Sequence, residues 1–513
     1  MAAASRTAAR RIAAALCLAS AAYVLLRVAL YYLDIGGTRR HHVEAASIAF
    51  VLALAVRMMT ADRGSPPAAA AHPPYPASTL LASIGFVGAA LLLYWPALFT
   101  GLFADDFVLF DAARAGRFTV WSELFRPSIF VLWRSLLAIA PAPSVALHAA
   151  NIVLHGLNAF LVSRLAAAIG LSRAMSLCAG ALFLSYPAAV EAVTWPSGLQ
   201  DVLMTTLVLT VLVVAVAAAT SRSRVVRISS ACAALVAALL TKETAIATPA
   251  LLLMLGLISE IRRPAWITAG ACAAVVAIFL LVRFSVLPLP ADYSPGASRY
   301  AAKELLVRPF ATLIVPFRAD ETLRHPALGL LSGAFVVLVL AFGAGRNGWR
   351  DHGAARGAAA AGMVLAAVGP VLTYFYVDPD LLGSRYVYLA LTGWVLLLAT
   401  SASGLSSRAG PAMAPLLCLI AFWIPATRTH LLLWQNAATA RNRILEAAAE
   451  AADPRCSGWI VSGVPATLEG VPLFVNGFPE AARPWLGEPI YMAAASQSDG
   501  RCQLKWTGER FEK

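Results

Sequence analysis

Charged side chains are scarce in this sequence. Asp, Glu, Lys and Arg together make up 13% of its 513 residues, whereas hydrophobic residues make up 60%. A soluble globular protein of this length needs more polar surface than that to cover its core. The composition therefore excludes an ordinary soluble protein and indicates a polytopic membrane protein.

Acidic residues are the rarer of the two charged kinds, since 27 Asp and Glu stand against 40 Lys and Arg. A net charge of +13 can indicate nucleic-acid binding, which needs a continuous basic stripe. Here the basic residues lie between apolar segments and form no such stripe. We therefore expect no nucleic-acid partner and interpret the basic residues as topology signals.

About thirteen apolar segments approach the roughly 20 residues that a helix needs to cross a bilayer. They lie at about 11–32, 44–59, 79–100, 143–168, 172–190, 200–220, 226–241, 244–260, 265–287, 327–344, 357–376, 385–402 and 410–427. A Pro- and Ala-rich stretch follows the second segment and is typical of a flexible linker. We thus predict two accessory transmembrane helices in 1–60, a cytoplasmic linker in 61–78, a transmembrane catalytic domain in 79–427 and a C-terminal domain in 428–513.

Basic residues recur in every second loop between these segments, as at Arg10, Arg173 and Arg263. Cytoplasmic loops of membrane proteins carry an excess of Lys and Arg. The pattern therefore places the N-terminus in the cytoplasm and the alternate loops outside, including the long loops 101–142 and 288–326. The C-terminal tail then also faces outward.

Two adjacent carboxylates, Asp105 and Asp106, follow directly after the apolar segment 79–100. A charge beside a membrane helix is costly and marks a candidate functional site. The outward turn between two later segments adds Glu191 and Asp201, so up to four carboxylates can converge at one membrane face. Such acids could hold a divalent metal ion, or they could serve equally well in a metal-free site.

Basic side chains are predicted at the same face. Lys242 and Glu243 interrupt an apolar run, so each needs an ionic partner, and a structural salt bridge is as plausible as a functional one. Arg385 stands at the outer mouth of a segment. A guanidinium suits a phosphate because it bonds two oxygens at once, although Arg also anchors helices at the membrane interface.

The segment 143–168 has one polar side. His148, Asn151, His155 and Asn158 fall within an arc of roughly 80° when the segment is a helix. Hydrogen bonding between helices is the expected role of the last three. His148 lies nearest the outer end, where it could reach the carboxylate loop.

The tail differs from the rest of the chain in composition. After a helical stretch at 430–452, the alternation in 458–463 and 472–477 predicts short strands, and hence a small α+β domain. Cys456 and Cys502 are the two of the seven cysteines that lie in this tail. In an oxidising compartment they could form a disulfide, or they could remain free.

The motifs stand in a recognisable order along the chain. They are Ala104-Asp-Asp-Phe-Val, Phe125-Arg126-Pro, the His148 to His155 helix, Tyr-Pro-Ala-Ala-Val-Glu191-Ala with Asp201, Lys242-Glu243, and Ser-Arg385-Tyr-Val-Tyr388-Leu. This series resembles the GT-C glycosyltransferases, in particular the membrane region of the transmembrane-and-TPR O-mannosyltransferases and their bacterial relatives. The resemblance covers about Thr79 to Trp434.

The resemblance implies an all-α polytopic membrane fold of GT-C type and an enzyme of the bacterial inner membrane. Such an enzyme takes a sugar from a polyprenyl-phosphate or polyprenyl-diphosphate lipid and transfers it, usually with inversion, to an acceptor outside the cytoplasm. The acceptor is a protein hydroxyl, a glycan or a lipid. Tyr186 stands where the relatives often have His, and no TPR array follows the last segment, so the acceptor stays open.

The resemblance also implies roles for individual residues. Asp105 and Asp106 match the acidic pair that holds the general base and contacts the acceptor. The matching donor-binding or cleft positions are Glu191, Asp201, Lys242, Glu243 and Arg385, and we add His148, Arg126 and Tyr388 as further candidates.

Two other classes of protein remain open. A transporter or flippase also has many spans, but it favours interrupted helices and polar groups near the bilayer midplane, whereas the acids here cluster at one face. A non-catalytic scaffold of envelope polysaccharide biosynthesis would tolerate the loss of Asp105 and Asp106.

Overall fold

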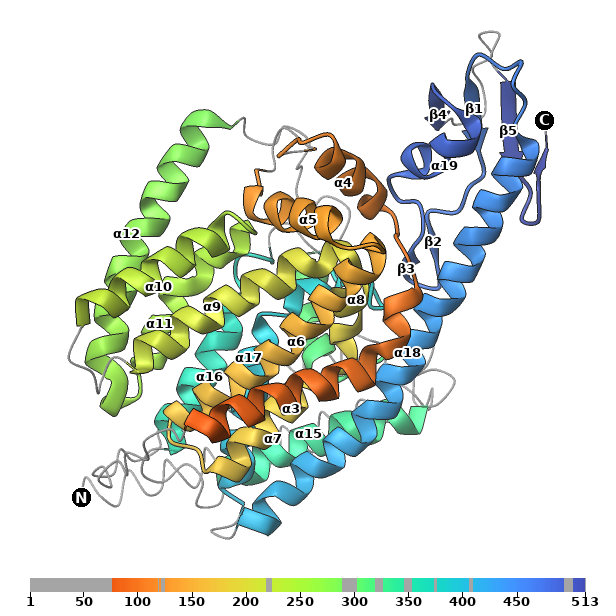
Figure 1. Cartoon of the computed structure of the whole chain (residues 1–513). Coiled ribbons are helices and arrows are strands. Elements are labelled where there is room, and N and C mark those ends of the chain that lie inside the picture. The colour runs from red at the N-terminus through yellow and green to blue at the C-terminus, as the bar shows by residue number, and fades with distance from the viewer. Residues whose placement is uncertain are drawn as a thin grey trace, which may run out of the picture.

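The computed structural model describes residues 76–512, with gaps at 119, 121–124, 218–223, 288–301, 319–325, 346–352, 373–375, 406–408 and 493–501. The two predicted accessory helices at 11–32 and 44–59, and nearly all of the linker, lie outside the described residues. The described part consists of a large helical bundle and a smaller C-terminal unit, residues 453–512 (Figure 1).

The bundle is built from long apolar helices that lie side by side (Figure 1). They are α3 Pro76–Tyr94, α6 Pro143–Ala168, α7 Arg173–Ser185, α9 Leu199–Ala217, α10 Arg224–Leu239, α11 Thr248–Leu255, α12 Arg262–Val286, α13 Ala302–Ile314, α15 Pro326–Gly345, α16 Gly353–Val368, α17 Ala390–Ser403 and α18 Ala409–Ala451. Residues 390–402 of α17 are all buried, as expected for a helix that is apolar on every side. This helix packs against α7, α15, α16 and α18 at the centre of the bundle.

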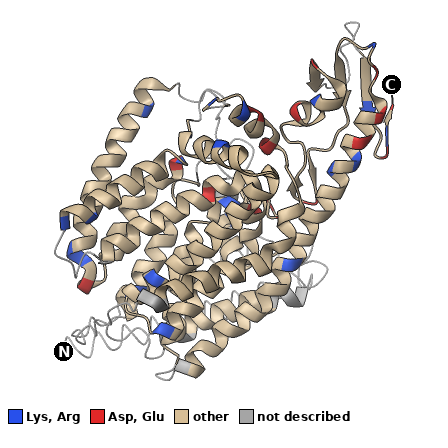
Figure 2. Cartoon of the chain, viewed as in Figure 1, with Lys and Arg blue, Asp and Glu red and all other residues tan. Residues whose placement is uncertain are grey.

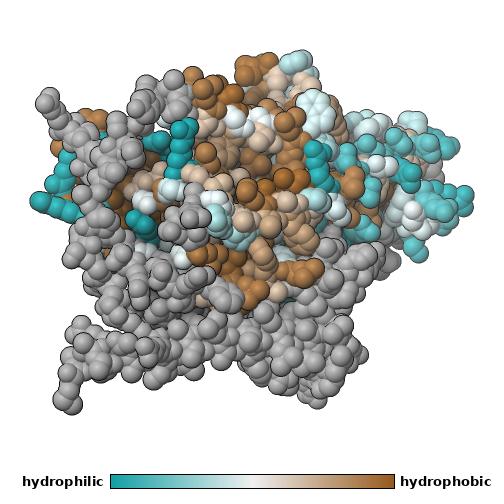
Figure 3. Space-filling view, turned by 90° about the horizontal axis from the view of Figure 1, so that it is seen from below, coloured by the Kyte–Doolittle hydropathy of each residue, from teal (hydrophilic) through white to brown (hydrophobic). Residues whose placement is uncertain are grey.

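The outer surface fits a membrane. Few charged residues lie in the middle of the helices (Figure 2), and the described face seen from below is mostly hydrophobic between hydrophilic ends (Figure 3). Within the described residues, five helices are long and apolar enough to cross a membrane, and a sixth span results if Arg173–Ser185 and Pro187–Thr194, bent by 53°, count as one. The helical membrane fold is thus supported, whereas the number of thirteen spans is not shown.

Several predicted segments are shorter helices than the apolar runs suggested. The run 244–260 begins with a 3-10 turn, η5 Glu243–Ala247, before α11, and the run 385–402 begins with η8 Ser384–Val387 before α17. In both places the polar residues that open the run adopt tight turns. The two turns carry Glu243 and Arg385, whose charged side chains lie at the end of the bundle.

The predicted long loop after α3 folds over one end of the bundle. A 3-10 turn, η1 Trp95–Phe99, leads to α4 Asp105–Arg114, and α5 Pro127–Ile139 follows (Figure 1). Asp105 and Asp106 occupy the first turn of α4, where the helix dipole favours negative charge. Pro127 starts α5, as is common at the first helical position.

Helix α18 joins two segments that the sequence predicted separately, the apolar segment 410–427 and the helical stretch 430–452. It continues as one helix of 43 residues, about 65 Å long at 1.5 Å per residue, from the bundle to the C-terminal unit (Figure 1). Leu431, Trp434 and Ala437 are buried and extend its packing face beyond the apolar run. The predicted helical stretch at 430–452 is therefore confirmed, and it continues the last apolar segment without a break.

The C-terminal unit contains a four-stranded sheet of order β4-β1-β5-β6. Strand β1 Trp459–Ser462 pairs in parallel with β4 Ile490–Met492 and β5 Cys502–Trp506, and β6 Phe511–Glu512 pairs antiparallel with β5. Helix α19 Phe478–Leu486 packs beside β4, and β2 Thr467–Leu468 forms a small hairpin with β3 Val471–Pro472.

The strand predicted over 472–477 is wrong beyond Pro472. After Pro472 the backbone contacts the loop that carries Asp105 and Asp106, which we call the acidic loop. The Ala104 amide of this loop donates to the Leu473 carbonyl at 2.9 Å, and the strand therefore ends at Pro472. Cys456 and Cys502, for which the sequence left pairing open, form a disulfide with a Cα–Cα distance of 5.7 Å. This bond joins the segment after α18 to β5.

We expect Cys456→Ser to loosen the C-terminal unit. The disulfide closes a loop of 46 residues, and cross-links of such loops stabilise by about 4 kcal/mol. Hydrogen exchange of residues 459–462 and 502–506 should therefore accelerate, and Cys418→Ser, which removes an exposed free thiol, should leave it unchanged. Equal exchange in wild type and Cys456→Ser would contradict the stabilising role.

Candidate functional site

Asp106 is a fully buried carboxylate with every oxygen engaged. Its Oδ1 accepts hydrogen bonds from the Ser197 amide at 2.7 Å and from the Ser197 hydroxyl, and its Oδ2 accepts from the Phe103 amide at 2.8 Å. Burial raises the pKa of Asp106 to about 8, while the hydrogen bonds from Ser197 and Phe103 act in the opposite direction. Asp106 therefore fastens the start of α4 to the turn before α9.

Asp105 has a different environment. It is half-buried, and among the described residues its one hydrogen-bond donor is the Asn476 side-chain amide, at 2.7 Å from Oδ1. No cation contacts this carboxylate among the ion pairs of the described residues. Of the two adjacent acids, Asp105 is the one with an oxygen left to accept a further proton or hydrogen bond.

Arg385 is held rigidly by Glu191. The Glu191 carboxylate accepts from Arg385 Nη1 at 2.7 Å, from the Arg385 amide at 2.8 Å, from the Gly383 amide at 3.1 Å and from the Ser384 hydroxyl at 3.2 Å. The guanidinium carbon also lies 4.2 Å from the centre of the Trp195 ring. These contacts fix both the position and the plane of the guanidinium.

The acidic surroundings keep Arg385 charged. Burial acts to lower its pKa, but the nearby groups Tyr386, Glu191, Asp201 and Asp105 outweigh burial and raise the pKa above its usual value. Asp105 contributes to this increase in pKa, although the described ion pair of Arg385 is with Glu191.

Lys242 also contacts the Tyr386 ring. Its Nζ donates to Asp201 Oδ1 at 2.6 Å and stands 4.9 Å from the ring centre of Tyr386, and the Arg385 guanidinium carbon lies 4.8 Å from the same ring centre. Burial lowers the pKa of Lys242 to about 8, although the charge of Asp201 opposes this shift. Two cations from distant segments are thus brought to one aromatic ring.

Arg126 completes the set of ion pairs. It precedes α5, and its Nη2 and Nε donate to Glu243 Oε2 at 2.7 and 3.1 Å, while its Nη1 donates to Gln200. Arg283 approaches the same Glu243 carboxylate at 3.6 Å. The pair connects the outer helix α5 to the turns that carry Lys242 and Asp201.

We call these residues the charged cluster. Its members are Asp105, Arg126, Glu191, Asp201, Lys242, Glu243 and Arg385. The structure thus pairs Glu191 with Arg385 of η8, Asp201 in the first turn of α9 with Lys242, and Arg126 with Glu243 of η5. Glu191 borders a small cavity of about 30 Å³, and the described residues that line it do not include Asp105, Lys242 or Arg385.

His148 and Tyr388 have other partners than the charged cluster. His148 is buried, with Nε2 at 2.9 Å from the Gly101 carbonyl, and the Tyr388 hydroxyl lies 2.6 Å from His155 Nδ1 and 3.3 Å from Asn158 Nδ2. Asn151 donates to the Trp195 carbonyl at 2.8 Å. The polar side of α6 therefore makes the interhelical hydrogen bonds that the sequence predicted. The His148 side chain contacts the carboxylate loop at a backbone carbonyl, that of Gly101.

Three residues that shape the site had no signal in the sequence. Ser197 and Asn476 are small polar residues in turns, and the Asn476 contact joins positions 371 residues apart. Arg441, within α18, donates to the Thr100 carbonyl at 2.8 Å and to the Leu102 carbonyl, and its guanidinium lies over the Phe103 ring. It supports the loop before Asp105 from the side of α18.

Metal binding was left open by the sequence. In the described part of the chain, no three His, Cys, Asp or Glu side chains are grouped closely enough to hold a metal ion. The four carboxylates of the sequence argument each have a separate partner, namely Asn476, Ser197, Arg385 and Lys242.

Comparison with known proteins yields a similarity of fold. No protein family model and no curated sequence matches the chain. The structure of apo ArnT from Cupriavidus metallidurans superposes with a TM-score of 0.50 at 14% identity, over 82% of this chain and 87% of that one. ArnT from the same organism bound to undecaprenyl phosphate gives 0.45 at 13% identity, over 83% and 87%. ArnT is a GT-C glycosyltransferase, and at this identity the likeness shows that the chain shares the fold.

We expect Asp106→Asn to lower the melting temperature, because an amide would set an N–H group against the N–H of either Ser197 or Phe103. One unsatisfied buried donor costs about 1–3 kcal/mol. Asp105→Asn removes a single half-buried contact and serves as the matched control, with a melting temperature close to that of the wild type. Thermal unfolding in detergent measures both, and an unchanged midpoint for Asp106→Asn would refute the structural role.

Proposed function

We propose that the protein is a glycosyltransferase that moves a sugar from a polyprenyl-phosphate or polyprenyl-diphosphate lipid to an acceptor outside the cytoplasm. The observation that carries the proposal is the placement of two fixed cations, Lys242 and Arg385, at the Tyr386 ring at one end of an apolar bundle, with the Asp105 carboxylate contributing to the charge environment of Arg385. The fold shared with ArnT supports the same reaction class.

The cations suit the leaving group. When the bond between the sugar and the phosphate oxygen breaks, the electron pair stays on the lipid phosphate, which gains negative charge. Lys242 and Arg385 can stabilise this charge without covalent chemistry, because they are already held in place by Asp201 and Glu191. A guanidinium whose plane is fixed by aromatic rings is well suited to phosphate oxygens.

Asp105 suits the role of general base. It would take the proton of the acceptor hydroxyl while the acceptor oxygen forms its bond to the anomeric carbon, on the face opposite the leaving phosphate. The configuration at that carbon is then inverted. Asp106 is less suited to this step, because the three hydrogen bonds it accepts use both of its oxygens.

The lipid donor accounts for an enzyme embedded in a membrane. We infer the bacterial inner membrane as its location, with the N-terminus in the cytoplasm and the charged cluster and C-terminal unit on the outer side, from the distribution of Lys and Arg in the loops. The acceptor is a protein hydroxyl, a glycan or a lipid. Mannose is the first sugar to test, since the motifs resemble those of O-mannosyltransferases.

The test uses the purified protein with radiolabelled polyprenyl-phosphate sugars and a membrane extract as acceptor source. Label should move from the lipid into acceptor, and Asp105→Asn should reduce kcat by about 100-fold or more, because a general base contributes that much. Glu446→Gln, an exposed carboxylate on α18, should behave as wild type. Full activity in Asp105→Asn would eliminate Asp105 as the base, and no transfer from any donor would overturn the function.

The pH dependence reports on Lys242. Because the pKa of this ammonium is lowered to about 8, its charge is lost as pH rises through that value, and transfer should decline with it. Lys242→Arg should remain active at higher pH, since a guanidinium stays protonated there, whereas Lys242→Met should be impaired at every pH. An identical alkaline limb in wild type and Lys242→Arg would exclude Lys242 as the titrating group.

A further inference from the structure

The segment 469–477 of the C-terminal unit lies directly against the acidic loop and the turn before η8. The Leu473 carbonyl accepts from the Ala104 amide at 2.9 Å, and the Phe474 ring stacks on Phe107 with centroids 6.3 Å apart. Arg318 donates to the Glu469 carbonyl at the other end of the segment. Backbone and side-chain contacts therefore hold it along its length.

Two glycines allow this close approach. A Cβ on Gly477 would lie 2.4 Å from the Ala104 carbonyl oxygen, and one on Gly470 would lie 2.8 Å from the Asp380 backbone and side chain. Both glycines have positive φ, at 84° and 77°, which side-chain-bearing residues rarely adopt. The fit leaves no room for the segment to shift toward the bundle.

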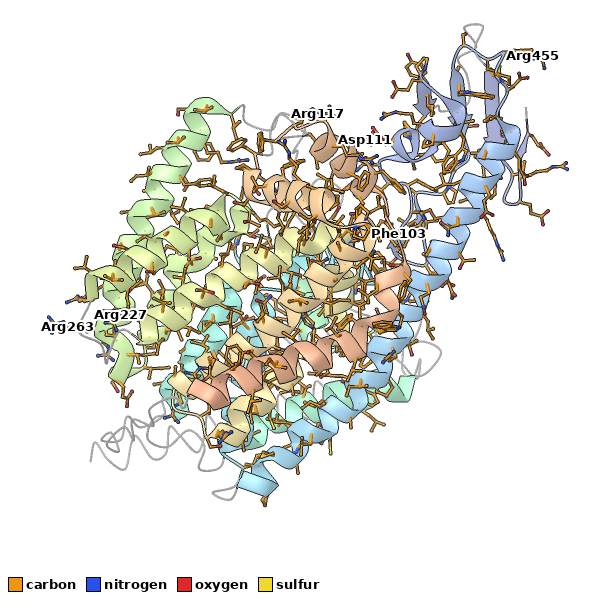
Figure 4. All side chains as sticks on the ribbon, in the orientation of Figure 1. Phe103, Asp111, Arg117, Arg227, Arg263 and Arg455 are labelled. Atoms are coloured by element: carbon orange, nitrogen blue, oxygen red, sulfur yellow. A yellow bond between two sulfur atoms is a disulfide. The ribbon has the colours of Figure 1, made fainter. Side chains whose placement is uncertain are left out.

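Helix α19 adds a third contact. Arg483 on this helix forms an ion pair with Asp111, which lies on the side of α4 that faces α19 (Figure 4). Asp111 is six positions after Asp105 on the same helix. The C-terminal unit thus holds α4 at its start and along its length.

Asn476 stands between these anchors and is itself exposed. Its Nδ2 donates to Asp105 Oδ1 at 2.7 Å, which leaves Oδ2 without a donor among the described residues. The Asp105 carboxylate can rotate about its side-chain bonds, and one hydrogen bond gives it a defined orientation. A hydrogen bond to a charged group is also stronger than one between neutral groups. Removal of the donor would let the carboxylate rotate.

We infer that Asn476 is a positioning residue for Asp105, and that the C-terminal unit is in this way a component of the transfer site. Asn476 holds one oxygen of the carboxylate so that the other faces the acceptor hydroxyl. The inference rests on the proposed function in that Asp105 is taken as the base. Beyond that function, the new element is that a segment outside the membrane bundle, 469–477, orients the Asp105 carboxylate.

Two substitutions separate hydrogen bonding from space filling. Asn476→Ala should lower kcat by about 10- to 100-fold, the range for loss of a bond to a charged group, with the donor KM unchanged. Asn476→Asp keeps the size but replaces the donor by a like charge, so it should be at least as impaired. Val475→Ala, at a neighbouring side chain that is 50% exposed, should match the wild type. Wild-type kcat in Asn476→Ala, or full activity in Asn476→Asp, would overturn the inference.

A second measurement does not depend on transfer. Labelling of the Asp105 carboxylate by a water-soluble carbodiimide and an amine, followed by mass spectrometry of the full-length protein, should increase by about twofold or more in Asn476→Ala, because the side chain is released. Val475→Ala should label like the wild type. Unchanged labelling would overturn the positioning role, whereas increased labelling in a protein that transfers no sugar would preserve the contact and reject the proposed function.

Discussion

The ion pair between Glu191 and Arg385 is the interaction on which the rest of the site depends. One buried carboxylate satisfies four donors, all of them from the three consecutive residues 383–385 that precede the central helix α17. Without Glu191, the Arg385 charge and two backbone amides would be left unpaired in a buried region, which is costly. The pair therefore connects the bend after α7 to the centre of the bundle and presents a cation at the bundle end.

The same rule of pairing governs the neighbouring charges. Lys242 is matched by Asp201 and Arg126 by Glu243, so most of the charge in the cluster is neutralised locally. Asp105 is the exception, since its described partner is the uncharged amide of Asn476. Asp106 is also held by neutral donors, but its hydrogen bonds occupy both carboxylate oxygens, whereas Asp105 accepts one described bond, at Oδ1.

Many of the charged side chains at this end of the bundle could be predicted from the sequence, because an unpaired charge in an apolar chain is costly and is therefore expected to have a charged partner. That argument located Asp105, Glu191, Lys242 and Arg385. It could not locate Asn476 or Ser197, since polar residues in turns are common and their partners are distant in sequence. His148 and Tyr388, added as further donor-binding candidates, are buried, and their side chains contact the Gly101 carbonyl and His155. Apolar runs indicated the helices of the bundle but not where 3-10 turns shorten them.

The length of the 43-residue helix α18 constrains how the C-terminal unit is placed relative to the bundle. It starts within the bundle and ends at the C-terminal unit, so its length sets the height and the angle at which Asn476 meets Asp105. Each added residue advances a helix by about 1.5 Å and turns it by about 100°. A single insertion in its outer half would swing the C-terminal unit to another side of the bundle. Insertions and deletions should therefore be tolerated in the loops of this protein and excluded from this helix, because the number of its residues determines the distance between the bundle and the segment that contacts Asp105.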